Sequence, residues 1–415
     1  MPAVARTGDQ RLDLRGLLDA VEASPPIDAV DVLADELRRM VDARHVSLLI
    51  TDNSGGAVRR LSHVAPERDG RDGLNERAQS LGLPGSAYER VLSSQKVEIA
   101  PEHDGWLVLV PVTERGDAIG LLELSLLDHP DDETLDYLHA TAHALAYVLV
   151  ASRRHTDLFE WAQRNIPFSL AAEIQRRLLP SAYTIEGGPF TLAGWLEPAS
   201  DVAGDTFDYS IDREFLYASI TDAMGHSTEA ALLATLTVGS FRNSRRALAS
   251  PSEQADAANE ALLTGTRADQ FVTGQLLRIH LDDGHVEFVN AGHPPPFLVR
   301  AGQVRQLDVM TQPVLGVTTG AYGTQELDLA PGDRLLLLTD GFLERRAGRL
   351  DLPAVLAASA ARHPREVVRE LATRVLNLTG GSLSDDATVL CIDWYGRGEH
   401  RNAIGGASLA RATGV

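Results

Sequence analysis

Apolar residues near the start of the chain recur at helical spacing and are followed by short apolar runs. A helix starting after Asp28, whose side chain can cap the first free amides, is predicted by apolar positions three and four residues apart. These positions are Val30, Leu33, Leu37, Met40 and Val41. Apolar runs at 45–50 and 57–61 predict two strands, separated by the turn cluster DNSGG. The charged, glycine-bearing stretch 65–82 predicts a loop.

The next part of the chain repeats this order of a helix and paired strands. A short helix is predicted at 86–94, and strands are predicted at 106–112 and 118–127, on either side of the turn ERGD. The run 131–152 predicts a long helix with acidic residues in its first turn. Together these elements predict an antiparallel sheet flanked by helices over residues 28–150.

A polar connector follows at 151–187. Its first half, RRHTDLFEWAQRN, predicts a helix that Pro167 interrupts. Its second half, SLAAEIQRRLLP, predicts another helix, with Leu170, Ile174 and Leu178 on one face. Two interpretations stay open for this helix. It is either a packed linker or an element that dimerises or carries a signal between two domains.

Short apolar runs dominate the chain from residue 188 to residue 395. Strands are predicted at 190–200, 215–223, 271–281, 285–293, 295–302, 334–341 and 387–394. Helices are predicted at 227–248, 251–266 and 352–380. Strands in series, interrupted by helices, predict stacked sheets with helices outside. The remaining stretch, 396–415, has few apolar residues and predicts a disordered tail.

Composition and charge narrow the class of protein. A chain of 415 residues is too long for one ordinary core and predicts two or three domains. The net charge of -20 argues against nucleic-acid binding, which depends on basic patches. A single cysteine, Cys391, cannot form a disulfide within the chain, so a cytoplasmic location is predicted. The N-terminus lacks the apolar core of a signal peptide and no run reaches 18 apolar residues, so no membrane association is expected.

Four short stretches place aspartates at the ends of apolar strands: SDVAGDTFD, SITDAMG, LLLLTDGF and SDDATVL. They contain Asp201, Asp205, Asp208, Asp222, Asp340, Asp385 and Asp386. Each aspartate alone is more often a turn or helix cap. If several of these carboxylates converge, they repel one another and raise one another's pKa. A divalent cation such as Mg²⁺ or Mn²⁺ would remove the repulsion and stabilise the charged carboxylates. Spacing alone cannot show that they converge.

Two resemblances to known families follow from these motifs. The segment GSAYERVL and the hairpin VPV…IGLLEL make residues 28–150 resemble a GAF domain, a small sensory module, without indicating its ligand. From EIQRRLLP at the start to SDDATVL at the end, residues 170–395 resemble the metal-dependent PPM (type 2C) serine/threonine phosphatases. The branch is that of stage II sporulation protein E and related sigma-factor regulators. Between these ends, ITDAMGHSTEAALL, NAGHPPPFLVR and LAPGDRLLLLTDGFLERR follow in the family's order.

The second resemblance implies a fold and a set of metal ligands. The expected fold class is α+β, with the catalytic domain an α-β-β-α sandwich that holds two divalent cations, Mn²⁺ or Mg²⁺. Asp222 is expected to bridge both ions, the carbonyl of Ala223 to assist, and Asp205 to serve the first ion. Asp340 and Asp385 are expected to hold the second ion. Additional ligands are expected among Asp201 and Asp386.

The expected function is dephosphorylation of a protein. The resemblance implies that the substrate is a phosphorylated STAS-domain antagonist of an anti-sigma factor, whose dephosphorylation frees a sigma factor. The GAF-like domain would regulate this activity through an unknown small ligand or signal, and the connector would support a homodimer. The alternative is a pseudophosphatase that acts as a regulated binding module. A phosphohydrolase for small molecules is disfavoured because no GxxxxGK[ST] loop is present.

The resulting domain boundaries are predicted in order along the chain. They are an N-terminal extension at 1–27, a GAF-like domain at 28–150, a helical linker at 151–187, a phosphatase domain at 188–395 and a disordered tail at 396–415. Several positions depart from the family pattern: Ala203 and Ala223 replace frequent glycines, Thr206 replaces an aromatic residue, and His226 and Ser227 are also unusual. His293 is expected to anchor a turn and not to bind a metal.

Overall fold

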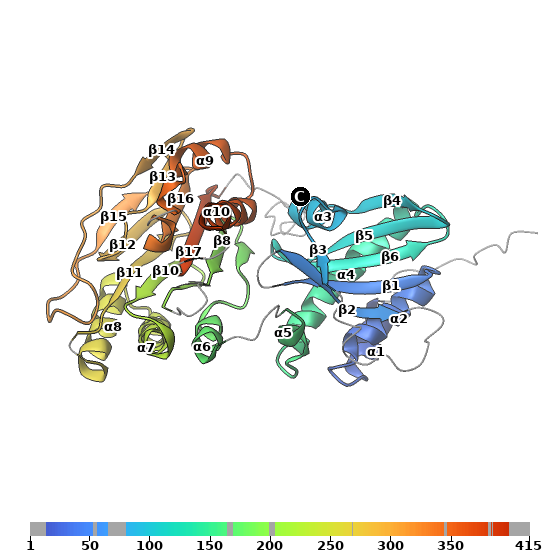
Figure 1. Cartoon of the computed structure of the whole chain (residues 1–415), viewed down its shortest axis with the longest axis horizontal. Coiled ribbons are helices and arrows are strands. Elements are labelled where there is room, and N and C mark those ends of the chain that lie inside the picture. Colours follow the sequence, from blue (N-terminus) through green and yellow to red (C-terminus); the bar gives the residue numbers. More distant parts are fainter. Residues whose placement is uncertain are drawn as a thin grey trace, which may run out of the picture. The chain divides into compact units, whose positions relative to one another are not determined.

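The computed structural model describes residues 14–52, 56–64, 80–163, 169–198, 204–267, 269–343, 347–380, 383 and 385–397. Contacts divide the chain into two units that separate next to residue 166 (Figure 1). No helix in these ranges is both long and apolar enough to cross a bilayer. Residues 398–415 of the predicted tail, together with Pro167 and Asp201, lie outside the described residues.

The first unit is an antiparallel sheet with helices on both faces. Its helices are α1 (Leu14–Glu22), α2 (Ala29–Met40), α3 (Ala87–Ser94), α4 (Asp132–Ser152) and α5 (Leu158–Gln163). Its strands are β1 (His45–Thr51), β2 (Ala57–Val64), β3 (Ser80–Gly82), β4 (Glu98–Glu102), β5 (Gly105–Glu114) and β6 (Asp117–Leu126). They pair in the order β3-β2-β1-β6-β5-β4.

Alternation along β1 explains why both faces of this sheet are covered. Leu48 and Ile50 point to one side, where they pack in a core with α2 and α4, whereas Leu49 packs against α3 on the other side. The predicted antiparallel sheet is therefore present. Two of its strands were not predicted: Ser80–Gly82 falls in the expected loop, and Glu98–Glu102 is half-polar. Both are short edge strands that depend on pairing with β2 and β5.

The connector contains two helices that pack in different units. In α5, Phe159 and Ala162 are buried in the core of the first unit. In α6 (Leu170–Leu178), Ala171 and Gln175 are buried, and this helix packs beside α7 of the second unit. The predicted apolar face of α6 is wrong at one position, because Leu170 is 67% exposed. The most buried polar side chain of the helix, Gln175, takes its place on the packed face.

The second unit contains two antiparallel sheets. Its strands are β7 (Thr184–Glu186), β8 (Phe190–Glu197), β9 (Thr206–Ile211), β10 (Phe215–Ala223), β11 (Val272–His280), β12 (His285–Ala291), β13 (Phe297–Arg300), β14 (Gln303–Gln306), β15 (Gln325–Asp328), β16 (Arg334–Leu338) and β17 (Ala387–Trp394). Besides α6, its α-helices are α7 (Ser227–Arg246), α8 (Pro251–Gly265), α9 (Leu352–Ala358) and α10 (Pro364–Thr379). The sheets run β15-β12-β11-β10-β9 and β14-β13-β16-β17-β8-β7.

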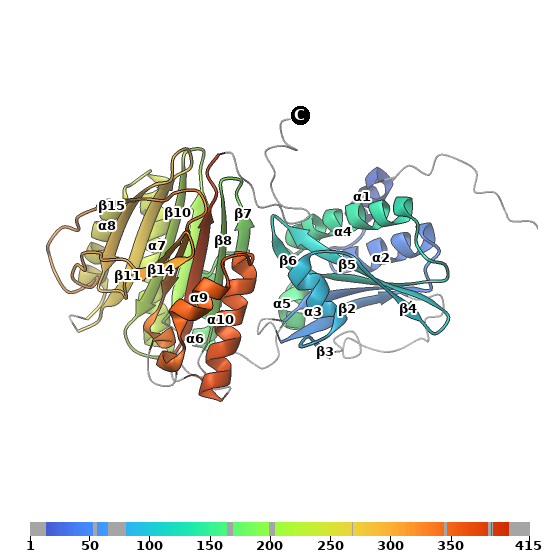
Figure 2. The same ribbon diagram turned by 90° about the horizontal axis from the view of Figure 1, so that it is seen from above.

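These elements form four layers, as Figure 2 shows. The two sheets pack face to face through a shared core that includes Phe207, Ile220, Leu337 and Ile392. Helices α7 and α8 cover the outer face of the first sheet, and α9 and α10 cover the outer face of the second. The order of layers is that of an α-β-β-α sandwich.

The helix predicted over 352–380 is interrupted. Helix α9 ends at Ala358 and α10 begins at Pro364, which takes the first helical position, where its missing amide costs nothing. The guanidinium of Arg334 explains why the break is stable: it donates to the carbonyl oxygens of Ser359 and Arg362 and forms a buried ion pair with Asp393. The intervening turn is thus attached to the sheet beneath it.

Candidate metal centre of the second unit

The predicted aspartates lie at the same edge of the two stacked sheets. Residues Thr206 and Thr221 are the last registered pair of β9 and β10, so Asp205 and Asp222 follow directly at the end of this pair of strands. In the other sheet, Leu338 pairs with Val389 of β17. The chain beyond this pair carries Asp340 on one side and Asp386 on the other.

Hydrogen bonds join the two sheets at this edge. The Thr339 hydroxyl donates to Asp205 Oδ2 at 2.7 Å, and its backbone amide donates to the Thr388 carbonyl at 3.0 Å. The Gly204 amide, which precedes β9, lies 3.3 Å from Asp386 Oδ2. Asp205 and Asp386 are 2% and 1% exposed. Two predicted site residues from different sheets are therefore buried together.

The electrostatics of Asp205 show that a third carboxylate is close. Burial raises the pKa of Asp205 well above its usual range, and the nearby charges of Asp222 and Asp386 raise it further. The hydrogen bond from Thr339 opposes this shift only in part. The structure thus brings Asp205, Asp222 and Asp386 within electrostatic reach of one another.

Asp340 and Asp385 are placed beside this group by the backbone. Asp340 begins a short 3-10 turn, Asp340–Phe342, that packs against β17. This contact is close: a Cβ atom on Gly341 would lie 1.9 Å from the Asp386 carbonyl oxygen, so glycine is required. The Asp385 carboxylate accepts a hydrogen bond from the Asp386 amide at 2.9 Å. Within the described ranges, no three acidic, histidine or cysteine side chains are arranged to hold an ion as they stand.

The small residues around Asp222 allow a close approach of two backbone segments. The Ala223 amide donates to the Gly204 carbonyl at 3.2 Å, and a Cβ atom on Gly204 would lie 2.5 Å from the Ala223 carbonyl oxygen. Only glycine fits at position 204. Ala223 is buried at the end of β10, in extended backbone that any residue can adopt. Gly225 and Ser227, in the turn that starts α7, both have positive φ, at 104° and 60°.

Sequence reasoning missed Gln175, which links α6 to the site. Its amide nitrogen Nε2 donates to the Asp205 carbonyl at 2.9 Å and to Asp386 Oδ2 at 2.6 Å. The C-terminal end of the same helix is also held, because Arg242 donates to the Leu178 carbonyl at 2.6 Å. The polar side chain on the packed face of an otherwise amphipathic helix was the available signal.

Two histidines and one aspartate of the motifs have other positions. His226 is exposed at the start of α7 and makes no side-chain cap. His293 is buried, and Asn290 holds its backbone through two hydrogen bonds, a geometry that anchors a turn as predicted. Burial lowers the pKa of His293 to about 3, so the ring is neutral near pH 7. Asp208 pairs with Arg242 and Arg245.

The residues at this edge fit a divalent cation in chemistry and in charge. They offer carboxylate and carbonyl oxygens, the donors that Mg²⁺ and Mn²⁺ prefer. The charges of Asp222 and Asp386 repel that of Asp205, and both Asp205 and Asp386 are buried. A cation at this edge would remove both the repulsion and the cost of burying charge.

Comparison with known proteins finds a family model and curated relatives that are similar to the second unit. Residues 212–395 match the family model described as stage II sporulation protein E. The phosphoserine phosphatase RsbU of Bacillus subtilis is 24% identical over 235 residues, covering 54% of this chain and 68% of RsbU. The phosphoserine phosphatase RsbP of the same organism is 26% identical over 184 residues, covering 43% of this chain and 45% of RsbP.

Solved structures show similar chains. The SiaA-PP2C domain of Pseudomonas aeruginosa is 20% identical, with a TM-score of 0.45, covering 54% of this chain and 94% of that one. Two others contain divalent cations: RsbX in complex with magnesium, and the catalytic domain of PstP with two manganese ions. They are 16% and 15% identical with TM-scores of 0.41 and 0.40, and cover 51% and 50% of this chain and 98% of each of theirs. Residues 212–395, which make up most of the second unit, therefore match the model of the stage II sporulation protein E family.

Proposed function

We propose that the second unit removes phosphate from a phosphoserine or phosphothreonine of a protein, with the help of two divalent cations, Mn²⁺ or Mg²⁺. The observation that carries this proposal is the burial of Asp205 within reach of the charges of Asp222 and Asp386 at one sheet edge. The ligands would be Asp205, Asp222, the carbonyl of Ala223, Asp340 and Asp385. Asp201 would be an additional ligand.

The chain's own residues would orient the site. When bound, the cations would supply a water of lowered pKa and neutralise charge on the phosphoryl oxygens. Thr339 would hold Asp205 by its hydroxyl, and Gln175 would hold Asp386, which would act by position or as an alternative ligand. In the overall reaction a water oxygen forms a bond to phosphorus as the bond between phosphorus and the serine oxygen breaks. The serine oxygen then gains a proton. The products are serine and inorganic phosphate.

The proposed substrate is a phosphorylated STAS-domain antagonist of an anti-sigma factor. Support comes from the relatives, since RsbU and RsbP are named phosphoserine phosphatases and the family model is that of a sporulation protein. Such a substrate would place the chain in the cytoplasm. The first unit is proposed to be a GAF-like sensory domain that responds to a small ligand, and the connector is proposed to support a homodimer.

The metal centre can be tested with paired variants. The purified chain with Mn²⁺ is expected to hydrolyse a phosphoserine STAS protein, and Asp222→Asn and Asp340→Asn are expected to abolish turnover and weaken Mn²⁺ binding measured by calorimetry. Asp328→Asn is a matched control, because Asp328 lies at the end of β15 with its side chain 82% exposed. Unchanged Mn²⁺ affinity in both site variants would refute the proposed centre. Wild-type protein that binds no Mn²⁺ at millimolar concentration would favour the pseudophosphatase.

A further inference from the structure

Three exposed apolar side chains of the second unit come from three different segments. Met224 follows β10, Leu263 is in the last turns of α8, and Val317 is in the segment between β14 and β15. They are 38%, 38% and 55% exposed. Exposed apolar residues are ordinary when scattered, but a group of them indicates an interaction surface. The question is therefore whether these three lie together.

Backbone pairing brings the first and third segments to one end of the sheet. The Met224 amide donates to the Phe271 carbonyl at 3.0 Å. The next residue, Val272, exchanges two hydrogen bonds with Leu315, at 3.0 and 2.9 Å. The chains of residues 223–224, 271–272 and 315–317 consequently run next to one another, with 271–272 in the middle.

Helix α8 brings Leu263 to the same place. Asn259 of this helix accepts from the Gly316 amide at 2.8 Å and donates to the Thr318 carbonyl at 2.7 Å, so its side chain brackets Val317. Leu263 is one turn further along the same helix face. Its neighbour Leu262 is so close to Gly316 that a Cβ atom there would lie 3.2 Å from the Leu262 Cβ. We call the group of Met224, Leu263 and Val317, with the half-buried Phe271, the apolar rim.

The segment that carries Val317 is held firmly. The Tyr322 amide donates to Asp256 Oδ1 at 2.8 Å, and the Tyr322 hydroxyl lies 3.0 Å from the Pro313 carbonyl oxygen. Tyr322 is only 6% exposed. Because the backbone on both sides of Val317 is fixed, its exposure does not come from a loose loop. A preformed apolar surface loses little entropy on binding a partner.

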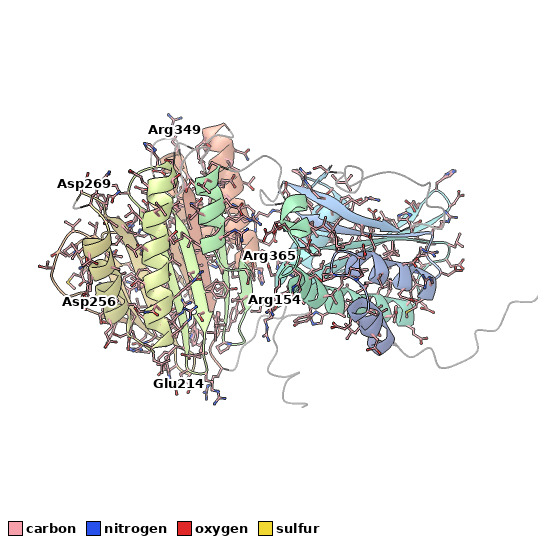
Figure 3. All side chains as sticks on the ribbon, turned by 90° about the horizontal axis from the view of Figure 1, so that it is seen from below. Arg154, Glu214, Asp256, Asp269, Arg349 and Arg365 are labelled. Carbon is pink, nitrogen blue, oxygen red and sulfur yellow. The ribbon has the colours of Figure 1, made fainter. Side chains whose placement is uncertain are left out.

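The apolar rim adjoins the candidate metal centre. Met224 is two residues beyond Asp222, and Val272 is the registered partner of Ala223. Figure 3 shows Asp269, in the segment between α8 and β11, at the end of the second unit opposite Glu214, which precedes β10. The rim is thus at the end of the sheet where Asp222 lies. Any folded protein that presents a phosphorylated side chain to the centre would cover it.

We propose that the apolar rim is the docking surface for the phosphoprotein substrate, and this inference rests on the function proposed above. Charged side chains border it: Arg267 forms ion pairs with Glu229 and Asp269, at 3.6 and 3.4 Å, and the two carboxylates exceed the charge of this one guanidinium. The three side chains are 63%, 65% and 73% exposed. An apolar centre with a charged border is the anatomy of a transient protein interface. The two border carboxylates disfavour an anionic membrane surface. The partner is therefore a folded protein with an apolar surface beside its phosphorylated residue and a basic group at the edge.

Charge introduced into the rim tests this inference. Val317→Asp and Leu263→Glu are expected to weaken binding of a phosphoserine STAS protein at least tenfold in calorimetry and to raise its KM by a similar factor. Turnover of p-nitrophenyl phosphate with Mn²⁺ is expected to stay the same, because this small substrate does not reach the rim. Leu378→Glu in α10 is the matched control, since Leu378 is 39% exposed and lies outside the rim. It is expected to change neither measurement.

The outcomes separate the inference from the proposed function. Unchanged affinity for the phosphoprotein in both rim variants overturns the docking surface, even if the enzyme is active. Wild type that turns over neither substrate overturns the proposed function, while a rim-dependent affinity in calorimetry still supports docking. A wild-type dimer that becomes monomeric in Val317→Asp, measured by sedimentation, shows that the rim binds a second copy instead and also overturns the inference.

Discussion

Gln175 connects helix α6 to the candidate metal centre, and its removal gives the sharpest prediction. The residue is 2% exposed, and its Nε2 atom donates to both the Asp205 carbonyl and the Asp386 carboxylate. In Gln175→Ala these two acceptors stay buried and lose this donor, while the Gly204 amide still lies 3.3 Å from Asp386 Oδ2. Neither has an obvious route to water, because Asp205 and Asp386 are themselves buried.

The expected magnitude follows from the two lost hydrogen bonds. A buried acceptor left without a donor costs about 1–3 kcal/mol, and more when it is charged. The free energy of unfolding should therefore fall by about 2–4 kcal/mol. If misplaced carboxylates weaken Mn²⁺ binding by about 1.4 kcal/mol, the Mn²⁺ dissociation constant rises about tenfold.

A second buried glutamine provides the control. Gln275 in β11 is 0% exposed and donates to the Pro294 carbonyl at 2.7 Å, but it is bonded to none of the site carboxylates. We expect Gln275→Ala to lose similar stability in urea denaturation and to keep the wild-type Mn²⁺ affinity in calorimetry. The reasoning is refuted if Gln175→Ala binds Mn²⁺ as wild type does, or if both variants lose affinity equally.

Three further predictions concern buried charge. Burial lowers the pKa of His293 to about 3, whereas the histidine of the unfolded chain has a pKa of 6.5, so the unfolded chain takes up the proton first as pH falls. The free energy of unfolding should therefore drop by about 1.4 kcal/mol between pH 7.5 and 5.5. In denaturant titrations, His293→Gln should remove this pH-dependent drop. Arg334→Met leaves Asp393 buried without its partner and should cost about 3–5 kcal/mol in urea denaturation, with Arg334→Met/Asp393→Leu recovering part of the loss. Because the pKa of Asp205 is raised, the metal-free folded state holds the Asp205 proton more tightly than the unfolded chain does. The stability of the metal-free protein should therefore fall as pH rises above the ordinary carboxyl range. In thermal unfolding, Asp205→Asn should be more stable than wild type at pH 7 without metal and should lose the stabilisation by Mn²⁺.

Long helices and strands of this fold could be predicted from the sequence because the pattern of their own side chains determines which structure they form. The strand 387–394 is mostly apolar and is buried along its whole length in the second sheet. The edge strands β14 and β15 were missed because they are short and half-polar, and only pairing with β13 and β12 defines them. The break before Pro364 was missed because its anchor, Arg334, is distant in sequence.

The candidate site was only partly predictable for the same reason. Strand-end aspartates are visible in the sequence, and the structure brings Asp205, Asp222 and Asp386 into electrostatic reach. Gln175 is not visible, because its partners are a carbonyl 30 residues away and a carboxylate 211 residues away. Periodicity instead selected Leu170, which is exposed. The spacing of apolar residues predicts which apolar side chains are buried. It does not predict which polar side chains are buried because they form hydrogen bonds.

Helix α6 is attached to the second unit at two polar points, and this has a consequence for regulation. Gln175 bonds it to the candidate centre, and its last carbonyl, at Leu178, accepts from Arg242, which is itself paired with Asp208 of β9. A shift of α6 by one turn would break both contacts, and the loss of the first removes one of the hydrogen bonds that hold Asp386. A signal that moves this helix must therefore change the arrangement of the carboxylates. Since α6 is the second helix of the connector, we expect a movement of the connector to reach the candidate centre through Gln175.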